Sequence, residues 1–159
     1  MKILQIKIIK TLFFVGSCAA LLIFTNCGSD DGDGGEVTLS AAEANALLLD
    51  KDWSLSSATN AGTPRDEWTG FTLKFDLDTD LAGGSYTASG IPSDEGANLV
   101  WSTSGTFTAN NDLTALTRND GIVMTLVISE TALNVSFTVP ESSGRVDGFT
   151  GAWVFKMVP

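Results

Sequence analysis

The chain has 159 residues, with 9 lysine and arginine residues, 19 aspartate and glutamate residues and no histidine. Its net charge of −10 disfavours nucleic acid as a partner, because nucleic-acid binding depends on basic side chains that neutralise phosphates. Without histidine the chain cannot build Ser-His-Asp or Cys-His catalytic machinery, or a histidine-based zinc or iron site.

The first element in chain order is typical of an export signal. Residues 1–10 contain three lysines and no acidic residue, and a mostly apolar run follows from Thr11 to Phe24. This is a basic n-region followed by an h-region. A transmembrane helix needs about 20 apolar residues, so the pattern favours an export signal over a membrane anchor.

Cys27 ends this segment, and the residues around it resemble the lipobox of bacterial lipoproteins. The resemblance implies that the Cys27 thiol is diacylated, that residues 1–26 are removed as a signal peptide, and that the new N-terminus is acylated. Phe24 and Asn26 depart from the usual lipobox, which has an aliphatic residue and a small residue at those places. Cys18 is the alternative, because its preceding residues fit the strict pattern better, but it leaves an h-region of only about seven residues.

The segment after Cys27 carries Asp30, Asp31 and Asp33 among serine and glycine. Such a composition cannot bury apolar surface, and it predicts a lipidated tether over residues 27–38. An acidic Ser/Asp/Gly run directly after the lipid-bearing cysteine is similar to the surface-export signal of Bacteroidota-type lipoproteins. This resemblance implies an outer-membrane protein that faces the cell exterior. The alternative is a solvated spacer without address value.

Loss of residues 1–26 removes three of the nine basic residues and no acidic residue, which leaves a net charge of −13. We expect this charge to promote solubility and to disfavour docking on anionic lipid beyond the anchor on Cys27. Cys18 leaves with the signal and Cys27 is lipidated, so the folded domain is expected to have no disulfide. Residues 39–159 have the length of one domain with one core.

The domain begins with a predicted helix and continues as strands. Ser40 and Glu43 stand at capping-box spacing before an Ala/Leu run, which predicts a short helix over residues 40–50. After it the apolar period changes to 2, and turn residues recur about every 8 to 12 residues. Strands are expected in eight segments: 53–59, 71–77, 84–90, 99–109, 113–118, 122–129, 132–139 and 149–157. Residues 119–121, Asn-Asp-Gly, predict a hairpin.

These segments predict an all-β fold, an antiparallel up-and-down barrel of about eight strands, because closure removes exposed sheet edges. A β-sandwich is the alternative, and the short helix is expected to cover one end. The layout, with Trp53 on the first strand, "SGTFT" at 104–108, "RNDG" at 118–121 and the closing "GAWVFKM", resembles the lipocalin-like domains of Bacteroidota-type lipoproteins. The resemblance covers most of residues 40–159 and implies an architecture, not ligand transport.

Aromatic residues are expected to fill the barrel. Alternation places one set of large side chains inward and leaves no ligand cavity: Trp101, Phe107, Phe137, Trp153 and Phe155. The segment 122–129 is apolar on both faces, which predicts a strand covered on both sides.

Trp68 is out of phase with the strand that follows it. Unless a bulge at Gly70 resets the phase, Trp68 faces outward. An exposed tryptophan next to Arg65 can stack on a sugar ring, which makes Trp68 and Arg65 possible ligand-binding residues. The alternative is that Trp68 plugs the barrel end.

The acidic residues do not form a recognisable metal or catalytic motif. Asp76, Asp78 and Asp80 resemble the opening of a calcium loop, but Leu81 and Thr87 stand where an EF-hand requires glycine and glutamate. We therefore expect exposed carboxylates, and no metal or other cofactor.

A carboxylate-dependent hydrolase is disfavoured. Asp66/Glu67 and Asp94/Glu95 are pairs of acidic residues adjacent in sequence, and neighbours in extended backbone point to opposite sides. The sequence thus predicts a non-enzymatic binding or interaction module on the outer-membrane surface, with no catalytic residue and no named ligand. The alternatives are a glycan-binding lipoprotein of a polysaccharide-utilisation system, and the hydrolase.

Overall fold

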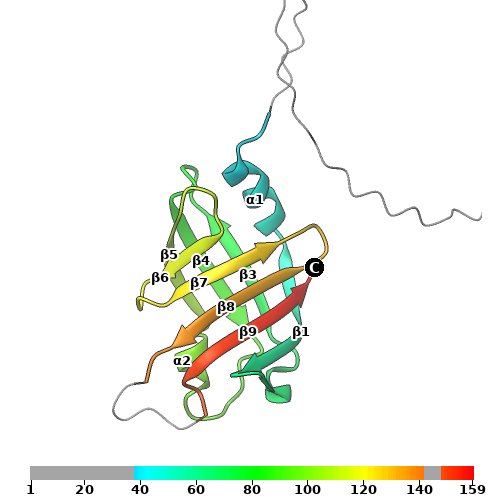
Figure 1. Ribbon diagram of the computed structural model, residues 1–159, viewed down its shortest axis with the longest axis vertical. Helices are drawn as coiled ribbons and strands as arrows, with labels where there is room; N and C mark the ends of the chain where they lie inside the picture. The colour runs from blue at the N-terminus through cyan, green and yellow to red at the C-terminus, as the bar shows by residue number, and fades with distance from the viewer. Residues whose placement is uncertain (1–37, 142–147) are drawn as a thin grey trace, which may run out of the picture. The chain divides into compact units, whose positions relative to one another are not determined.

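The computed structural model describes residues 38–141 and 148–159, which build a closed antiparallel barrel (Figure 1). Nine strands lie in these residues: β1 (Asp52–Asn60), β2 (Thr63–Pro64), β3 (Thr72–Leu77), β4 (Gly83–Ser89), β5 (Ser104–Ala109), β6 (Ala115–Arg118), β7 (Val123–Ile128), β8 (Leu133–Val139) and β9 (Gly151–Val158). Eight of them pair in the order β1-β3-β4-β5-β6-β7-β8-β9, and β1 also pairs with β9. The predicted eight-stranded up-and-down barrel is confirmed, and β2 is an extra strand on the end of β1.

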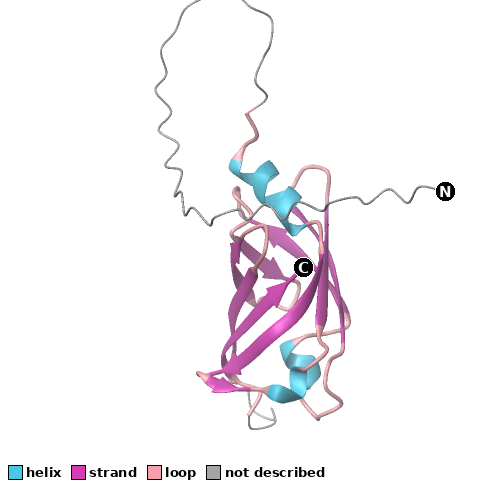
Figure 2. Cartoon of the chain, turned by 90° about the vertical axis from the view of Figure 1, so that its right-hand side faces the viewer, coloured by secondary structure: helices cyan, strands magenta, loops and turns pink. Residues whose placement is uncertain are grey.

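Short helices lie at both ends of the barrel (Figure 2). They are α1 (Ala41–Leu49), η1 (Asp66–Trp68) and α2 (Ala97–Val100). The hydroxyl of Ser40 accepts the N–H of Glu43 at 3.2 Å, and the Glu43 carboxylate accepts the N–H of Ser40 at 2.8 Å. The predicted capping box therefore starts α1. In the described part of the chain, no helix has the length and apolar character needed to cross a membrane.

The barrel interior is filled by aromatic rings. The five residues predicted to point inward are all buried: Trp101, Phe107, Phe137, Trp153 and Phe155. Phe155 contacts five other rings at centroid distances of 5.1 to 5.9 Å: Trp68, Phe71, Trp101, Phe137 and Trp153. Such edge-to-face and stacked contacts add to the free energy that burial alone provides. The interior is thus a packed core.

The prediction that segment 122–129 is covered on both sides is wrong. In β7, Met124 and Leu126 are buried, whereas Val123 is exposed and Val127 is 65% exposed. A barrel has only one interior, and β7 lies in its wall with one face turned to solvent. Apolar residues on both faces of this strand therefore do not indicate that both faces are covered.

Two local features interrupt the predicted alternation. The pairing of β1 with β9 shifts between Leu55 and Ser57, and this bulge turns Ala58 inward. Residues 99–101, predicted to begin a strand, instead belong to α2 and its end. There the chain crosses the barrel end, where no strand is available for pairing, so a helical turn satisfies the backbone and buries Val100.

Val37–Pro159 form one compact unit. All the strand pairings and the aromatic core lie within it. A chain that begins at residue 36 therefore contains all the strand pairings and core contacts that the structure describes.

Truncation of Phe155 tests the packed interior. Phe155→Ala should lower the free energy of unfolding by about 3–5 kcal/mol, because it leaves a cavity where five rings meet. The matched control is Val158→Ala, on the same strand but 43% exposed, which should change stability by about 0.5 kcal/mol or less. Urea unfolding of residues 36–159 measures both values, and equal losses would contradict a packed centre at Phe155.

Candidate functional site

Several predicted site residues lie outside the described residues. They are Cys27, predicted to be lipidated, and Asp30, Asp31 and Asp33, predicted to direct surface export, together with the predicted signal peptide, residues 1–26. Their roles stay predictions from the sequence.

The predicted outward position of Trp68 is wrong. Trp68 ends η1, is 0% exposed, and packs edge-on against Phe71, Trp153 and Phe155. Gly70, at φ +88°, turns the chain between η1 and β3, so alternation counted back from β3 does not extend to Trp68. Trp68 covers the barrel end, as the alternative proposed, and its ring is not available to stack on a sugar.

Arg65 is bound to the protein itself. Its guanidinium lies 4.9 Å from the ring centroid of Trp153 and 5.1 Å from that of Phe149. It also pairs with Glu67 and donates a hydrogen bond to the carbonyl of Gly148. These contacts attach η1 to the start of β9, so Arg65 has a structural role that the sequence analysis did not predict.

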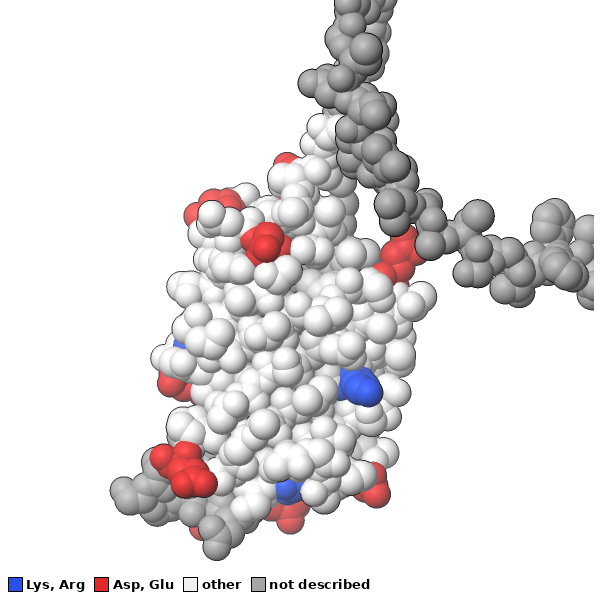
Figure 3. Space-filling view, in the orientation of Figure 1, with Lys and Arg blue, Asp and Glu red and all other residues white. Residues whose placement is uncertain are grey.

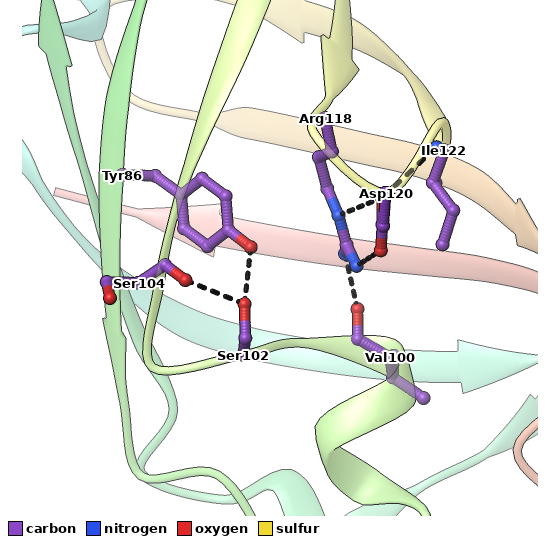
Figure 4. Close-up of polar contacts among 7 residues, drawn as sticks. All are labelled: Tyr86, Val100, Ser102, Ser104, Arg118, Asp120 and Ile122. Atoms are coloured by element: carbon purple, nitrogen blue, oxygen red, sulfur yellow. Dashed lines mark hydrogen bonds and ion pairs between the residues drawn. The ribbon is translucent and has the colours of Figure 1, made fainter.

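A second arginine closes the same end of the barrel. Arg118, at the end of β6, is only 3% exposed, and its guanidinium lies 5.3 Å from the ring centroid of Trp101. Its guanidinium donates a hydrogen bond to the carbonyl of Val100 at 2.6 Å, which gives a partner to a carbonyl at the C-terminal end of α2. It also forms an ion pair with Asp120 (Figure 4). This buried arginine was missed, although it shares the inward phase of Leu116 two residues earlier.

The environment of Asp120 favours its charged form. Burial by itself raises the pKa of Asp120, but hydrogen bonds from Arg118 and from the N–H of Ile122, together with attraction to the guanidinium, outweigh it. The pKa of this carboxyl is therefore lowered. Asp120 compensates the one charged side chain that is buried among the described residues.

Tyr86 extends the polar contacts across the same end (Figure 4). Ser102 Oγ donates to the carbonyl of Ser104 at 2.8 Å, so the hydroxyl of Tyr86, 2.8 Å away, must donate to Ser102. The ring of Tyr86 lies over Gly105, where an added Cβ would come within 2.7 Å of it. Glycine is thus required at 105 for this ring position.

These contacts explain closure of the barrel end and supply no reactive group. Both arginines are stacked on tryptophan and paired with a carboxylate. In residues 38–141 and 148–159, no three acidic or cysteine side chains gather as metal ligands. The indole N–H groups of Trp68 and Trp101 are buried without an oxygen acceptor, and both rings stand edge-on to neighbouring rings, a geometry compatible with N–H to π contacts.

The hollows that could receive a ligand lie on the outside. One of about 710 Å³, the wall hollow, runs along β7, β8 and β9 from Asp120 to Val154. Figure 3 shows that mostly uncharged side chains cover this face, with acidic side chains toward both ends. A second of about 500 Å³, the helix hollow, lies between α1 and the β3–β4 region and includes Leu47, Asp50 and Leu81.

Comparisons with known proteins found no match: no protein-family model, no curated protein and no solved structure matches this chain.

The Arg118–Asp120 pair predicts a pH-dependent stability. The pKa of Asp120 is lowered on folding, so its contribution is present above the unfolded value of about 3.9 and is lost as pH falls through the folded value. Asp120→Asn should cost about 1–2 kcal/mol at neutral pH, less than for a fully buried pair because the Asp120 side chain is 43% exposed.

The control for this pair is Asp94→Asn, which removes a charge from an exposed loop residue. Urea unfolding at pH 7 and at a series of lower pH values should show the full Asp120→Asn deficit at pH 7 and a deficit that shrinks as the pH falls below about 3.9 and through the lowered folded pKa of Asp120. A deficit of the same size at every pH would refute the role of the Asp120 charge.

Proposed function

We propose that this protein is an outer-membrane surface lipoprotein whose lipocalin-like barrel is a non-enzymatic binding or interaction module. The observation that carries the proposal is the packed interior around Phe155, which leaves the outer surface and the ends for recognition. The two arginines near the interior are bound to the protein itself, in line with a structural role for that end.

The anchor is proposed from the sequence. A basic segment and a short apolar run before Cys27 support export and lipidation, and the acidic run after it supports surface display. A Gly-rich tether of about eleven residues has a root-mean-square reach of roughly 20 Å. The barrel would then sit close to the outer membrane, facing the exterior.

The buried position of Trp68 removes the sequence basis for glycan capture. That alternative depended on an exposed ring at Trp68, and Trp68 is 0% exposed. Its neighbour Arg65 stacks on Trp153 and Phe149.

Replacing the lipidated cysteine tests the anchor. Cys27→Ser should abolish acylation and signal removal, because the thiol is the acceptor of the diacyl group. The matched control, Cys18→Ser, should be processed normally. Detergent partitioning and mass spectrometry of the mature N-terminus measure both outcomes, and an acylated peptide beginning at Cys18 would refute the assignment.

Replacement of the acidic residues after Cys27 tests surface display. Replacement of Asp30, Asp31 and Asp33 by alanine should leave the protein lipidated but facing the periplasm. A control that replaces the three aspartates of residues 76–80 removes the same charge from the folded domain and should remain on the surface. Protease accessibility on whole cells distinguishes the two, and unchanged accessibility of the first variant would show that the run is only a spacer.

A further inference from the structure

The helix hollow is an accessible hollow at one barrel end with a largely apolar lining. Its lining combines six apolar residues with three carboxylates: Leu39, Ala46, Leu47, Phe75, Leu77 and Leu81 with Glu43, Asp50 and Asp76. It lies at the end covered by α1 (Figure 2), opposite the end closed by the two arginines. At about 500 Å³ it has room for several side chains of a partner.

Two leucines of this hollow are exposed. Leu47 is 64% exposed and Leu39 is 50% exposed, whereas Leu49 on the same helix is fully buried in the core. Leu47 therefore contributes little to the packing of α1. Each exposed leucine forgoes part of the free energy that burial would provide, and a bound apolar side chain would recover some of it.

Leu81 adds an independent observation. Its φ is +59°, a left-handed conformation that is strained for a residue with a Cβ. Leu113 has a similar φ of +57°, but its side chain is fully buried in the core, which offsets the strain. Leu81 is only partly buried and lies at the hollow. Glycine would fit its backbone without strain, so leucine here chiefly adds apolar surface to the hollow.

The charge at the hollow has one sign. Glu43, Asp50 and Asp76 are exposed and line it, and no lysine or arginine does. Within the described residues, none of these three carboxylates forms an ion pair. A ligand that fits must therefore offer apolar groups to the leucines and positive charge to the rim.

We propose that the helix hollow binds an amphipathic segment of a partner protein that carries aliphatic and basic side chains. Aliphatic side chains would cover Leu47 and Leu81, and lysine or arginine would pair with Asp50 and Asp76. A membrane surface is a poorer occupant, because its anionic headgroups would be repelled by the same carboxylates. The proposal deepens the proposed function and rests on it only in taking the barrel to be an interaction module.

The probe is a synthetic leucine–lysine peptide of about 18 residues, five helical turns, with leucine on one face. Two matched peptides replace the lysines by glutamate or the leucines by serine. Binding to residues 36–159 is measured by calorimetry at about 150 mM salt, where screening limits purely electrostatic attraction. The leucine–lysine peptide should bind saturably with one site, about tenfold or more tighter than either matched peptide.

Variants locate the site. Leu47→Ser should weaken binding about tenfold, and Asp50→Asn should weaken it and reduce its salt dependence. The matched controls are Val127→Ser, an equally exposed apolar residue on the barrel wall, and Asp94→Asn; both should bind like the unmodified protein.

Three results would overturn the proposal: equal binding of the serine–lysine peptide, unchanged affinity of Leu47→Ser, or binding to anionic vesicles in preference to the peptide. The peptide-binding result can be distinguished from the result for the lipid anchor. Normal acylation at Cys27 without peptide binding would remove this site but leave the lipoprotein proposal. Peptide binding without acylation would support this site and remove the lipoprotein proposal.

Discussion

The packing of five aromatic rings around Phe155 is the interaction on which the rest of the structure depends. These rings come from η1, the residue before β3, the residue after α2, β8 and β9, so the Phe155 side chain joins segments from residue 68 to residue 155. No cysteine lies between residues 38 and 159, and burial has to supply the stability that a disulfide would otherwise add. Each aromatic contact adds about 0.5–1.5 kcal/mol beyond the area that it buries.

With the interior packed, the two ends of the barrel are closed in different ways. At one end, Arg65 and Arg118 each stack on a tryptophan and pair with a carboxylate two residues later. Both guanidinium groups are thus engaged in contacts within the protein. At the other end, α1 covers the barrel through Leu49 but leaves Leu47 exposed beside a row of carboxylates. A packed interior leaves no room for a ligand inside the barrel, and the binding role that we propose therefore falls to the outer surface.

The periodic parts of the fold were predictable from the sequence, and the aperiodic parts were not. The capping box of Ser40 and Glu43 and the alternation of β3, β8 and β9 are local signals, and both predictions are confirmed. Trp68 was misplaced because a positive φ at Gly70 breaks the count between η1 and β3. The burial of Arg118 was missed because a pattern of apolar residues identifies only apolar side chains as buried. Its spacing of two residues from Leu116 places both on the same face of β6. The helix hollow arises only when α1 lies beside β3, a tertiary placement that no local pattern encodes.

The packed interior is tested most directly by the accessibility of the tryptophans. All four in the sequence, Trp53, Trp68, Trp101 and Trp153, have no exposed surface in the fold. Acrylamide is the suitable quencher, because it is small and neutral and is not repelled by the acidic protein. Fluorescence of the native barrel should be blue-shifted and nearly unquenched, and urea should shift it to the red and expose every tryptophan to the quencher together. A native fraction quenched as strongly as free tryptophan would contradict the packed interior and place a solvent-accessible cavity beside one of these rings.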